Sequence, residues 1–257
     1  MQDLHRTVSR KIDKSIFDYN LIEPGDRILL GISGGKDSLV LLRMLAEKQP
    51  RFSIPFELHA AHVGTEYSIS SAIDFVKDQC AAWGVPFHLI PVRLASRLKE
   101  GRSLSCYWCS TQRRTELLRF AEDQGFDKIA LGHHMDDILS TFLMNLTHKG
   151  ELSTMLPYMS YDKYRQSIIR PLAWVDEKEI IALSQDFGYG RSVCKCGFDT
   201  TSKRKVARKT LALLEEAEGE GVRKRIMEAL HNPKPRYLIR RATDASEAHK
   251  GHASDRQ

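Results

Sequence analysis

The stretch GISGGKDSLVLL, residues 31 to 42, follows the short apolar run RILL and opens a segment rich in leucine. An apolar run that ends in glycines and continues with helical periodicity is typical of a β-strand that turns directly into an α-helix. The turn itself consists of six consecutive small or polar residues: Ser33, Gly34, Gly35, Lys36, Asp37 and Ser38. We therefore expect their polar groups to lie together at one end of the strand.

The same alternation of strand and helix continues along the chain. Short apolar runs predict five strands, at residues 27–32, 56–63, 86–94, 128–132 and 167–171. Most are separated by helical segments, which begin near Ser, Thr or Asp; three of the four end at Gly. These segments are residues 37–48, 70–84, 110–125 and 136–150. This pattern predicts an α/β fold with an open, mainly parallel sheet flanked by helices.

The domain organisation is predicted from changes in composition along the chain. We expect a helical N-terminal segment, an α/β domain, a small helical C-terminal part and a disordered polar tail, at residues 1–23, 24–175, 176–236 and 237–257 respectively. In the helical C-terminal part, Val206, Leu213 and their helical neighbours predict an apolar face opposite a basic one.

Composition limits the function classes. Of 257 residues, 42% are hydrophobic, which is enough for one large core, and Lys plus Arg exceed Asp plus Glu by 39 to 33. This charge is compatible with a polyanionic partner without requiring one. No stretch of about 18 apolar residues occurs and the first 20 residues carry charges throughout, so we expect neither a membrane helix nor a secretory signal, and a cytoplasmic location.

The turn at residues 33–38 has the chemistry of a phosphate site. Glycines allow close backbone approach, N–H groups at a helix start face an anion, and Lys36 adds positive charge. The spacing differs from a Walker loop, since Gly31 lies one residue too close and Asp37 follows Lys36, and the dinucleotide fingerprint G-x-G-x-x-G is missing. A glycine-rich turn capped by Ser33 is the alternative, but the Lys-Asp-Ser that follows favours the phosphate site.

On these residues the chain resembles the pyrophosphate-loop (PP-loop) ATPases, whose motif is S-G-G-x-D-S. Residues 33–38 match that motif position by position. The resemblance implies a Rossmann-like domain of the adenine nucleotide α-hydrolase type and an ATP site formed by the whole motif. It also implies cleavage of ATP to AMP and pyrophosphate with Mg²⁺ present, for which Asp37 is a candidate ligand.

A second motif, LGHHMDD, covers residues 131–137 at the end of the fourth predicted strand. If the strands are parallel, it lies at the same edge of the sheet as the loop. Its two histidines and two aspartates could bind a metal, cap a helix or contact ATP. PP-loop proteins carry a G-H-x-x-D-D segment beside ATP, and the resemblance implies that His133 and Asp137 are site residues.

Four of the five cysteines are clustered in sequence. Cys80 lies at helical spacing from Ile73 and Val76 and is expected in the core. The others form C-x-x-C and C-x-C pairs: Cys106 with Cys109, and Cys194 with Cys196. Four thiols in two pairs could close a tetrahedral zinc site, whereas three around a [4Fe-4S] cluster would leave one iron open. The residues alone favour zinc.

From about Leu4 to Tyr237 the chain also resembles the tRNA 2-thiocytidine synthetases. The similarity rests on residues 17–38, 128–145 and 168–180, on the C-x-x-C followed by Arg-Arg, and on the late Cys-Gly. It implies a [4Fe-4S] cluster held by Cys106, Cys109 and Cys196, with zinc as the alternative. It further implies that the base modified is cytidine 32 of the tRNA anticodon loop, and that a cysteine desulfurase is the sulfur source.

The late cysteines depart from the family pattern. Only Lys195 separates Cys194 from Cys196, where the relatives have two residues. Cys194 could therefore be a substitute ligand, a sulfur carrier or a bystander.

The basic residues around the late cysteines predict contact with RNA phosphates. Against a single acidic residue, Asp199, this segment offers Arg191, Lys195, Lys203, Arg204, Lys205, Arg208 and Lys209. A solvated helix face is the alternative interpretation. Arg113 and Arg114, one turn past Cys109, are candidates for phosphate contact or for stabilising the thiolates.

Other functions remain compatible with the sequence. A lysidine synthetase would share the loop and a tRNA partner but does not need clustered cysteines. A related enzyme could thiolate another nucleoside or a small molecule, and a zinc-stabilised RNA-binding module would not turn over ATP. The sequence is compatible with a homodimer.

Overall fold

The computed structural model describes residues 2–98, 105–189 and 202–239. A six-stranded sheet lies at its centre, in the order β3-β2-β1-β4-β6-β5. The strands are β1 (Arg27–Gly31), β2 (Glu57–Thr65), β3 (Phe87–Val92), β4 (Lys128–Leu131), β5 (Tyr158–Tyr161) and β6 (Tyr164–Ile169). Neighbouring strands are parallel except β5, which pairs antiparallel with β6. The five predicted strands and the mainly parallel α/β fold are confirmed.

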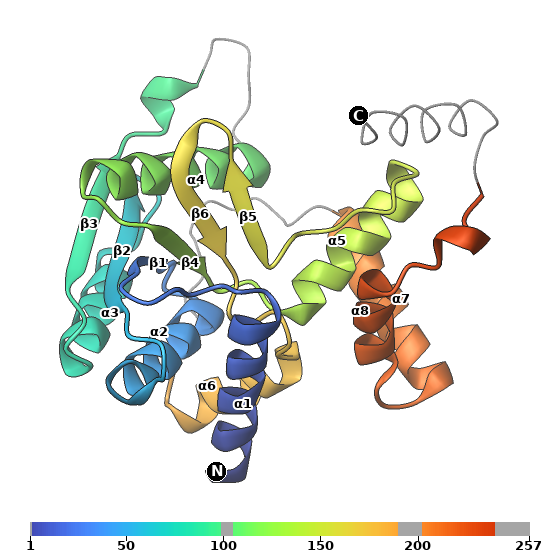
Figure 1. Cartoon of the computed structure of the whole chain (residues 1–257). Coiled ribbons are helices and arrows are strands. Elements are labelled where there is room, and N and C mark those ends of the chain that lie inside the picture. Colours follow the sequence, from blue (N-terminus) through green and yellow to red (C-terminus); the bar gives the residue numbers. More distant parts are fainter. Residues whose placement is uncertain (1, 99–104, 190–201, 240–257) are drawn as a thin grey trace, which may run out of the picture.

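Helices cover both faces of this sheet, and further helices pack at one end of it (Figure 1). They are α1 (Gln2–Asp18), α2 (Lys36–Lys48), α3 (Ser70–Ala82), α4 (Cys106–Asp123), α5 (Met135–His148), α6 (Glu177–Asp186), α7 (Ser202–Glu218) and α8 (Val222–His231). Short 3₁₀ turns occur at Gln49–Arg51, Ala95–Arg97 and Pro235–Tyr237. The helices α1, α2, α3 and α6 share a core with one face of the sheet, whereas α4 packs on the other face.

The alternation of side chains along β1 explains these two layers. Ile28 and Leu30 belong to the core beneath α1 and α2, while Leu29 belongs to the core beneath α4. A strand with apolar residues on both faces needs helices on both faces of the sheet to bury them. Each buried leucine or isoleucine contributes roughly 1.5–3 kcal/mol to the stability of the fold. Cys80 is buried in the first of these cores, where burial raises the pKa of its thiol to about 11. It is core filler, as its helical spacing predicts.

The helices α5, α7 and α8 form a third apolar cluster beside the sheet, which includes Trp174, Leu211 and Met227. The apolar face predicted for α7 is wrong by one position. Val206 and Leu213 are 60% and 55% exposed, and Ala207 and Leu211 are buried instead. On this helix Arg204 and Arg208 also reach inward and pair with Asp137.

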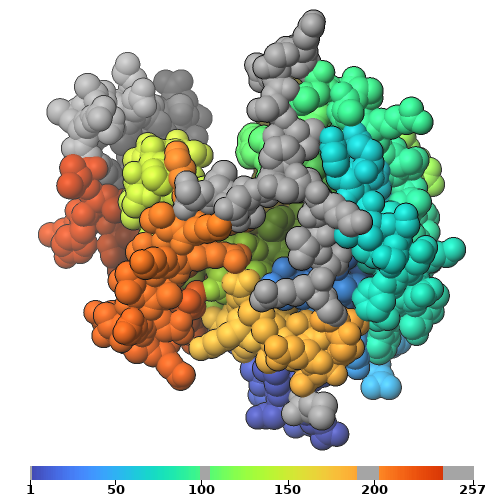
Figure 2. Space-filling view, turned by 180° about the vertical axis from the view of Figure 1, so that it is seen from behind, coloured from blue at the N-terminus to red at the C-terminus, as the bar shows by residue number. Residues whose placement is uncertain are grey.

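The helix α6 lies beside α7 on the surface seen in Figure 2, where they are gold and orange. Its side chains Ile180 and Leu183 enter the same core as α1 and α2. The predicted domain boundary at residue 175 stays a prediction, and this packing ties the residues just after it to the sheet. None of the helices in the described ranges is both long and apolar enough to cross a bilayer.

Candidate functional site

The loop between β1 and α2 is closed by hydrogen bonds among its own residues. The Ser38 hydroxyl donates to the Gly35 carbonyl at 2.9 Å and accepts from the Ser33 N–H at 3.2 Å, and the Gly35 N–H donates to the Ser33 hydroxyl at 3.3 Å. Gly34 has φ +85°, a conformation that favours glycine. Because Gly35 is the N-cap and has no side chain, the N–H groups at the start of α2 are left to bind an anion.

The LGHHMDD turn packs directly on this loop. β1 and β4 are parallel neighbours, with Gly31 opposite Leu131, so the turns that follow them meet at one edge of the sheet. A Cβ on Gly132 would lie 3.0 Å from the Asp37 carbonyl carbon and 3.0 Å from the Ser38 nitrogen. Only glycine allows this approach without a backbone shift.

Gly132→Ala is therefore expected to displace the loop. Overpacking against backbone atoms should lower the free energy of unfolding by about 1–3 kcal/mol and weaken ATP binding. Thermal denaturation and isothermal titration with ATP measure the two effects.

Gly84→Ala is the control, since its added Cβ meets no atom but its φ of +65° is unfavourable for alanine. It should cost about 1–2 kcal/mol of stability and leave ATP affinity unchanged. Unaltered ATP affinity in Gly132→Ala would contradict this account.

The Lys36 side chain lies between two carboxylates. Its Nζ donates to Asp37 Oδ1 at 2.8 Å and to Glu177 Oε1 at 3.3 Å. Burial disfavours the charged amine, but the hydrogen bond and charge of Asp37, together with Glu177, outweigh it and raise the pKa of Lys36. The lysine is held as a cation at the start of α2. Glu177, from α6, was not among the residues predicted for the site, because its distance in sequence hides the contact.

His134, which the sequence did not single out, is the histidine that contacts the aspartates. It is 1% exposed, and its Nε2 lies 3.4 Å from Asp137 Oδ2 and 4.0 Å from Asp37 Oδ1, with Nδ1 3.6 Å from Asp136. Burial favours the neutral ring, yet the nearby carboxylates of Asp136, Asp137 and Asp37 raise the pKa of His134. Two adjacent histidines in a motif give no signal as to which one turns inward.

His133 faces a different environment. Burial first, and then the charges of Arg170 and Arg114, lower the pKa of His133 to about 4, so the ring is neutral at physiological pH. Arg170 is 2% exposed, and burial together with Arg114 lowers its own pKa to about 10. A neutral imidazole here can accept or donate a hydrogen bond without adding charge.

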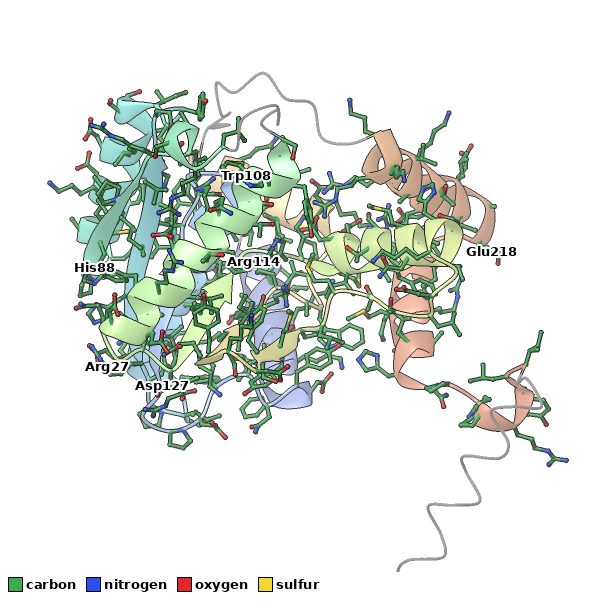
Figure 3. All side chains as sticks on the ribbon, turned by 90° about the horizontal axis from the view of Figure 1, so that it is seen from above. Arg27, His88, Trp108, Arg114, Asp127 and Glu218 are labelled. Carbon is green, nitrogen blue, oxygen red and sulfur yellow. The ribbon has the colours of Figure 1, made fainter. Side chains whose placement is uncertain are left out.

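His133 lines a cavity of about 150 Å³ between the loop and α4. Its other walls are formed by the ends of β1 and β4, the loop after β1, the middle of β2, and the second and third turns of α4: Gly31, Ile32, Ser33, Ala61, Val63, Ser110, Arg113, Arg114, Leu117 and Leu131. The helix α4 lies across the sheet, with Trp108 in its first turn and Arg114 two turns further on (Figure 3). The cavity therefore joins the loop at residues 33–38, hereafter the phosphate loop after its predicted role, to the helix that carries the C-x-x-C.

The first turn of α4 holds both cysteines of the C-x-x-C. The helix begins at Cys106, four residues before the predicted start, because the Ser105 hydroxyl caps it by accepting from the Trp108 N–H at 3.2 Å. Cys106 and Cys109 are half-buried and, three residues apart, lie on the same side of the helix. The positive end of the helix dipole favours thiolates there. These two residues fit a shared metal or cluster site. Cys194 and Cys196 lie outside the described residues.

Arginines from the C-terminal helices reach the aspartates. Arg208 Nη2 lies 3.3 Å and Arg204 Nη1 3.7 Å from Asp137 Oδ1, and Arg223 of α8 pairs with Asp136. The sequence interpretation assigned Arg204 and Arg208 to RNA, but both side chains point towards the LGHHMDD turn. Charge alone could not reveal this, because the buried carboxylates that attract them lie far away in sequence.

The pH dependence of stability follows from Asp136. Burial opposes its ionisation, but the nearby His134, the hydrogen bond from the Glu177 N–H and the charge of Arg223 lower the pKa of Asp136 from 3.8 to about 2. A lowered folded-state pKa contributes stability above the unfolded value that is lost as pH falls through the folded one.

Asp136→Asn is expected to cost about 2 kcal/mol at pH 7. The difference from the wild type should shrink between pH 4 and 2, in the window set by the two pKa values. Urea unfolding across this pH range measures both. A difference that stays constant with pH would contradict the role of the Asp136 charge.

The fold and this edge of the sheet define a class of protein. A mainly parallel sheet, a self-closed Ser-Gly-Gly-Lys-Asp-Ser loop before α2 and a Gly-His-His-Met-Asp-Asp turn packed on that loop are the features expected of a PP-loop domain. A family model of the PP-loop domain matches residues 4–211.

Comparisons with known proteins agree with this class. The tRNA-cytidine(32) 2-sulfurtransferase of Xylella fastidiosa (strain M23) is 37% identical over 240 residues, which span 91% of this chain and 79% of that protein. The enzyme of the same name from Geotalea uraniireducens (strain Rf4) is 34% identical over 243 residues, spanning 93% and 96%. The chain therefore belongs to the PP-loop family and, within it, to the tRNA-cytidine(32) 2-sulfurtransferases. It is an enzyme of the tRNA sulfurtransferase class.

A solved structure shows the same fold. The U34-tRNA thiolase NcsA from Methanococcus maripaludis, with its [4Fe-4S] cluster, superimposes with a TM-score of 0.73 at 24% identity. The match covers 89% of this chain and 78% of that one.

Proposed function

We propose that the protein adenylates the C2 oxygen of a tRNA cytidine, at position 32, and replaces that oxygen with sulfur to give 2-thiocytidine. The observation that carries the proposal is the cavity of about 150 Å³ that joins the phosphate loop to the C-x-x-C helix. A base bound there can meet both an activated phosphate and a sulfur centre. The names of the curated relatives support the tRNA substrate and the position.

The first step uses the phosphate loop. The C2 oxygen of cytosine is a poor leaving group, so the oxygen attacks the α-phosphorus of ATP and pyrophosphate departs with the electrons of the broken P–O bond. The N–H groups at the start of α2 and the Lys36 cation stabilise the charge that develops on pyrophosphate. Mg²⁺ would neutralise the phosphates, with Asp37 as its candidate ligand.

In the second step a sulfur nucleophile attacks C2, and AMP leaves with the former C2 oxygen. Cys106 and Cys109, with Cys196, would hold a [4Fe-4S] cluster, which supplies an open iron for sulfide, and zinc is the alternative metal. His133, neutral at physiological pH, lines the same cavity and can hydrogen-bond to the base. The sulfur would come from a cysteine desulfurase as persulfide, and a thiol or other two-electron reductant would bring it to the sulfide level.

The tRNA must present an unstacked base. C2 lies within the ring, so the anticodon-loop nucleotide has to leave the stack and enter the cavity, which single-stranded loops allow at modest cost. Action in the cytoplasm and assembly as a homodimer stay predictions.

Mass spectrometry of tRNA nucleosides from a strain that lacks the gene tests the proposal. Loss of 2-thiocytidine alone, restored by the wild-type gene and not by a Lys36→Ala gene, is the expected result. If every thionucleoside persists at parental levels, cytidine is not the substrate. Loss of a different thionucleoside would assign the same chemistry to another base.

A further inference from the structure

The side chain of Arg208 points into the site, whereas an arginine that only contacts RNA would point away from the protein surface. Its Nη2 lies 3.3 Å from Asp137 Oδ1 and its Nη1 3.4 Å from Glu177. The Nε atom is buried and has no hydrogen-bond partner among the residues that the structure describes. The guanidinium thus lies between two acidic side chains, which engage only some of its five N–H donors.

The same carboxylates also face the phosphate loop. Glu177 Oε1 accepts from Lys36 Nζ at 3.3 Å, and Asp137 lies 3.4 Å from His134, which in turn lies 4.0 Å from Asp37. Lys36, Glu177, Arg208 and Asp137 therefore form one chain of ion pairs from the start of α2 to α7. Figure 2 shows α6 and α7 next to each other on this side of the molecule.

ATP would change the charge balance of that chain. Its triphosphate brings several negative charges to the loop, and Lys36 has to turn from Glu177 towards the phosphates to neutralise them. Arg208, which contacts the same Glu177 Oε1 as Lys36, at 3.4 Å, then presents beside the loop a planar guanidinium that suits phosphate oxygens. The side chain is 40% exposed, and its N–H groups that are not engaged by Asp137 or Glu177 can donate to phosphate oxygens.

The geometry points to Arg208, with Arg204 beside it, as a catalytic residue that contacts the polyphosphate of ATP together with Lys36. This inference rests on the proposed adenylation. When the bond between the α-phosphorus and its bridging oxygen breaks, the electron pair stays on pyrophosphate, and the guanidinium neutralises that charge. The helix α7 thereby completes the ATP site, and the two arginines are not primarily RNA contacts.

The test compares Arg208→Ala, Arg208→Lys and the control Arg225→Ala in the full-length protein. Arg225 is an exposed arginine on α8 that donates to the Glu218 carbonyl, so its loss removes the same charge from the same helical part. Three quantities are measured: tRNA-dependent AMP formation at saturating tRNA, the Kd of α,β-methylene-ATP with Mg²⁺, and the Kd of tRNA.

Arg208→Ala should reduce AMP formation about 10²–10³-fold and weaken the ATP analogue, while the tRNA Kd changes less than about twofold. Arg208→Lys keeps the positive charge but loses the planar guanidinium. Its rate of AMP formation and its affinity for the ATP analogue should lie between those of Arg208→Ala and the wild type. Arg225→Ala should match the wild type. The inference is overturned if Arg208→Ala weakens tRNA binding and leaves AMP formation and analogue binding intact.

A parallel Lys36→Ala measurement separates the two possible failures. If Lys36→Ala is inactive while Arg208→Ala is active, only the role of Arg208 is wrong. If Lys36→Ala itself keeps full AMP formation, the loop is not the ATP site and the proposed function fails with it.

Discussion

Cys106→Ser is expected to abolish both iron binding and tRNA thiolation. A serine hydroxyl stays protonated near neutral pH and is a poor ligand for iron, whereas Cys106 lies in the first turn of α4, where the helix dipole favours the thiolate. Iron and acid-labile sulfide in anaerobically purified protein, together with 2-thiocytidine formed on tRNA, measure the two losses. ATP should still bind, because no part of the phosphate loop changes.

The control for this variant is Cys80→Ala, which removes a thiol from the core and should lower stability while leaving iron content unchanged. Zinc in place of iron predicts a different pattern for Cys106→Ser: lost zinc, a lower Tm and little spectroscopic change. Full iron content in Cys106→Ser would exclude Cys106 as a ligand.

Lys36→Ala is expected to reduce AMP formation about 10²–10³-fold, the effect of removing one preorganised charge from a developing anion. The change should also leave Glu177 without its lysine partner, so a modest change in stability is expected beside the catalytic loss. A pyrophosphate-release assay with tRNA present gives the rate, and thermal denaturation shows that the fold is kept.

Lys178→Ala serves as the control for Lys36→Ala. Lys178 is exposed on α6, next to Glu177, and pairs with Glu215, so its removal changes the local charge without touching the loop. Its rate should equal that of the wild type. A Lys36→Ala rate within twofold of the wild type would rule out a role for the lysine in pyrophosphate departure.

The parts of the fold that could be predicted are those with a strong local pattern. The parallel strands read as apolar runs, and Gly84, Gly125 and Gly150, which end three helices, all have positive φ as C-cap glycines do. The strand β5 was not predicted, since it is a short edge strand with half-exposed side chains and no sustained alternation.

The site was predictable where a motif lies in one continuous segment. Residues 33–38 and the LGHHMDD turn could be named and placed at one edge of the sheet. The partners Glu177, Arg208 and Arg223 could not, because each comes from a later helix and contacts the site only through tertiary packing. It could not be predicted either that His134, and not His133, contacts the aspartates, because this is determined by the backbone conformation between β4 and α5.

The ion pairs between α7, α8 and the aspartates have a consequence for biosynthesis. The sheet and the LGHHMDD turn leave the ribosome before the arginines that neutralise Asp136 and Asp137 have been translated. During that interval the nascent domain carries carboxylates whose arginine partners do not yet exist. The nucleotide site of a newly made molecule is therefore complete only after the last helices have docked.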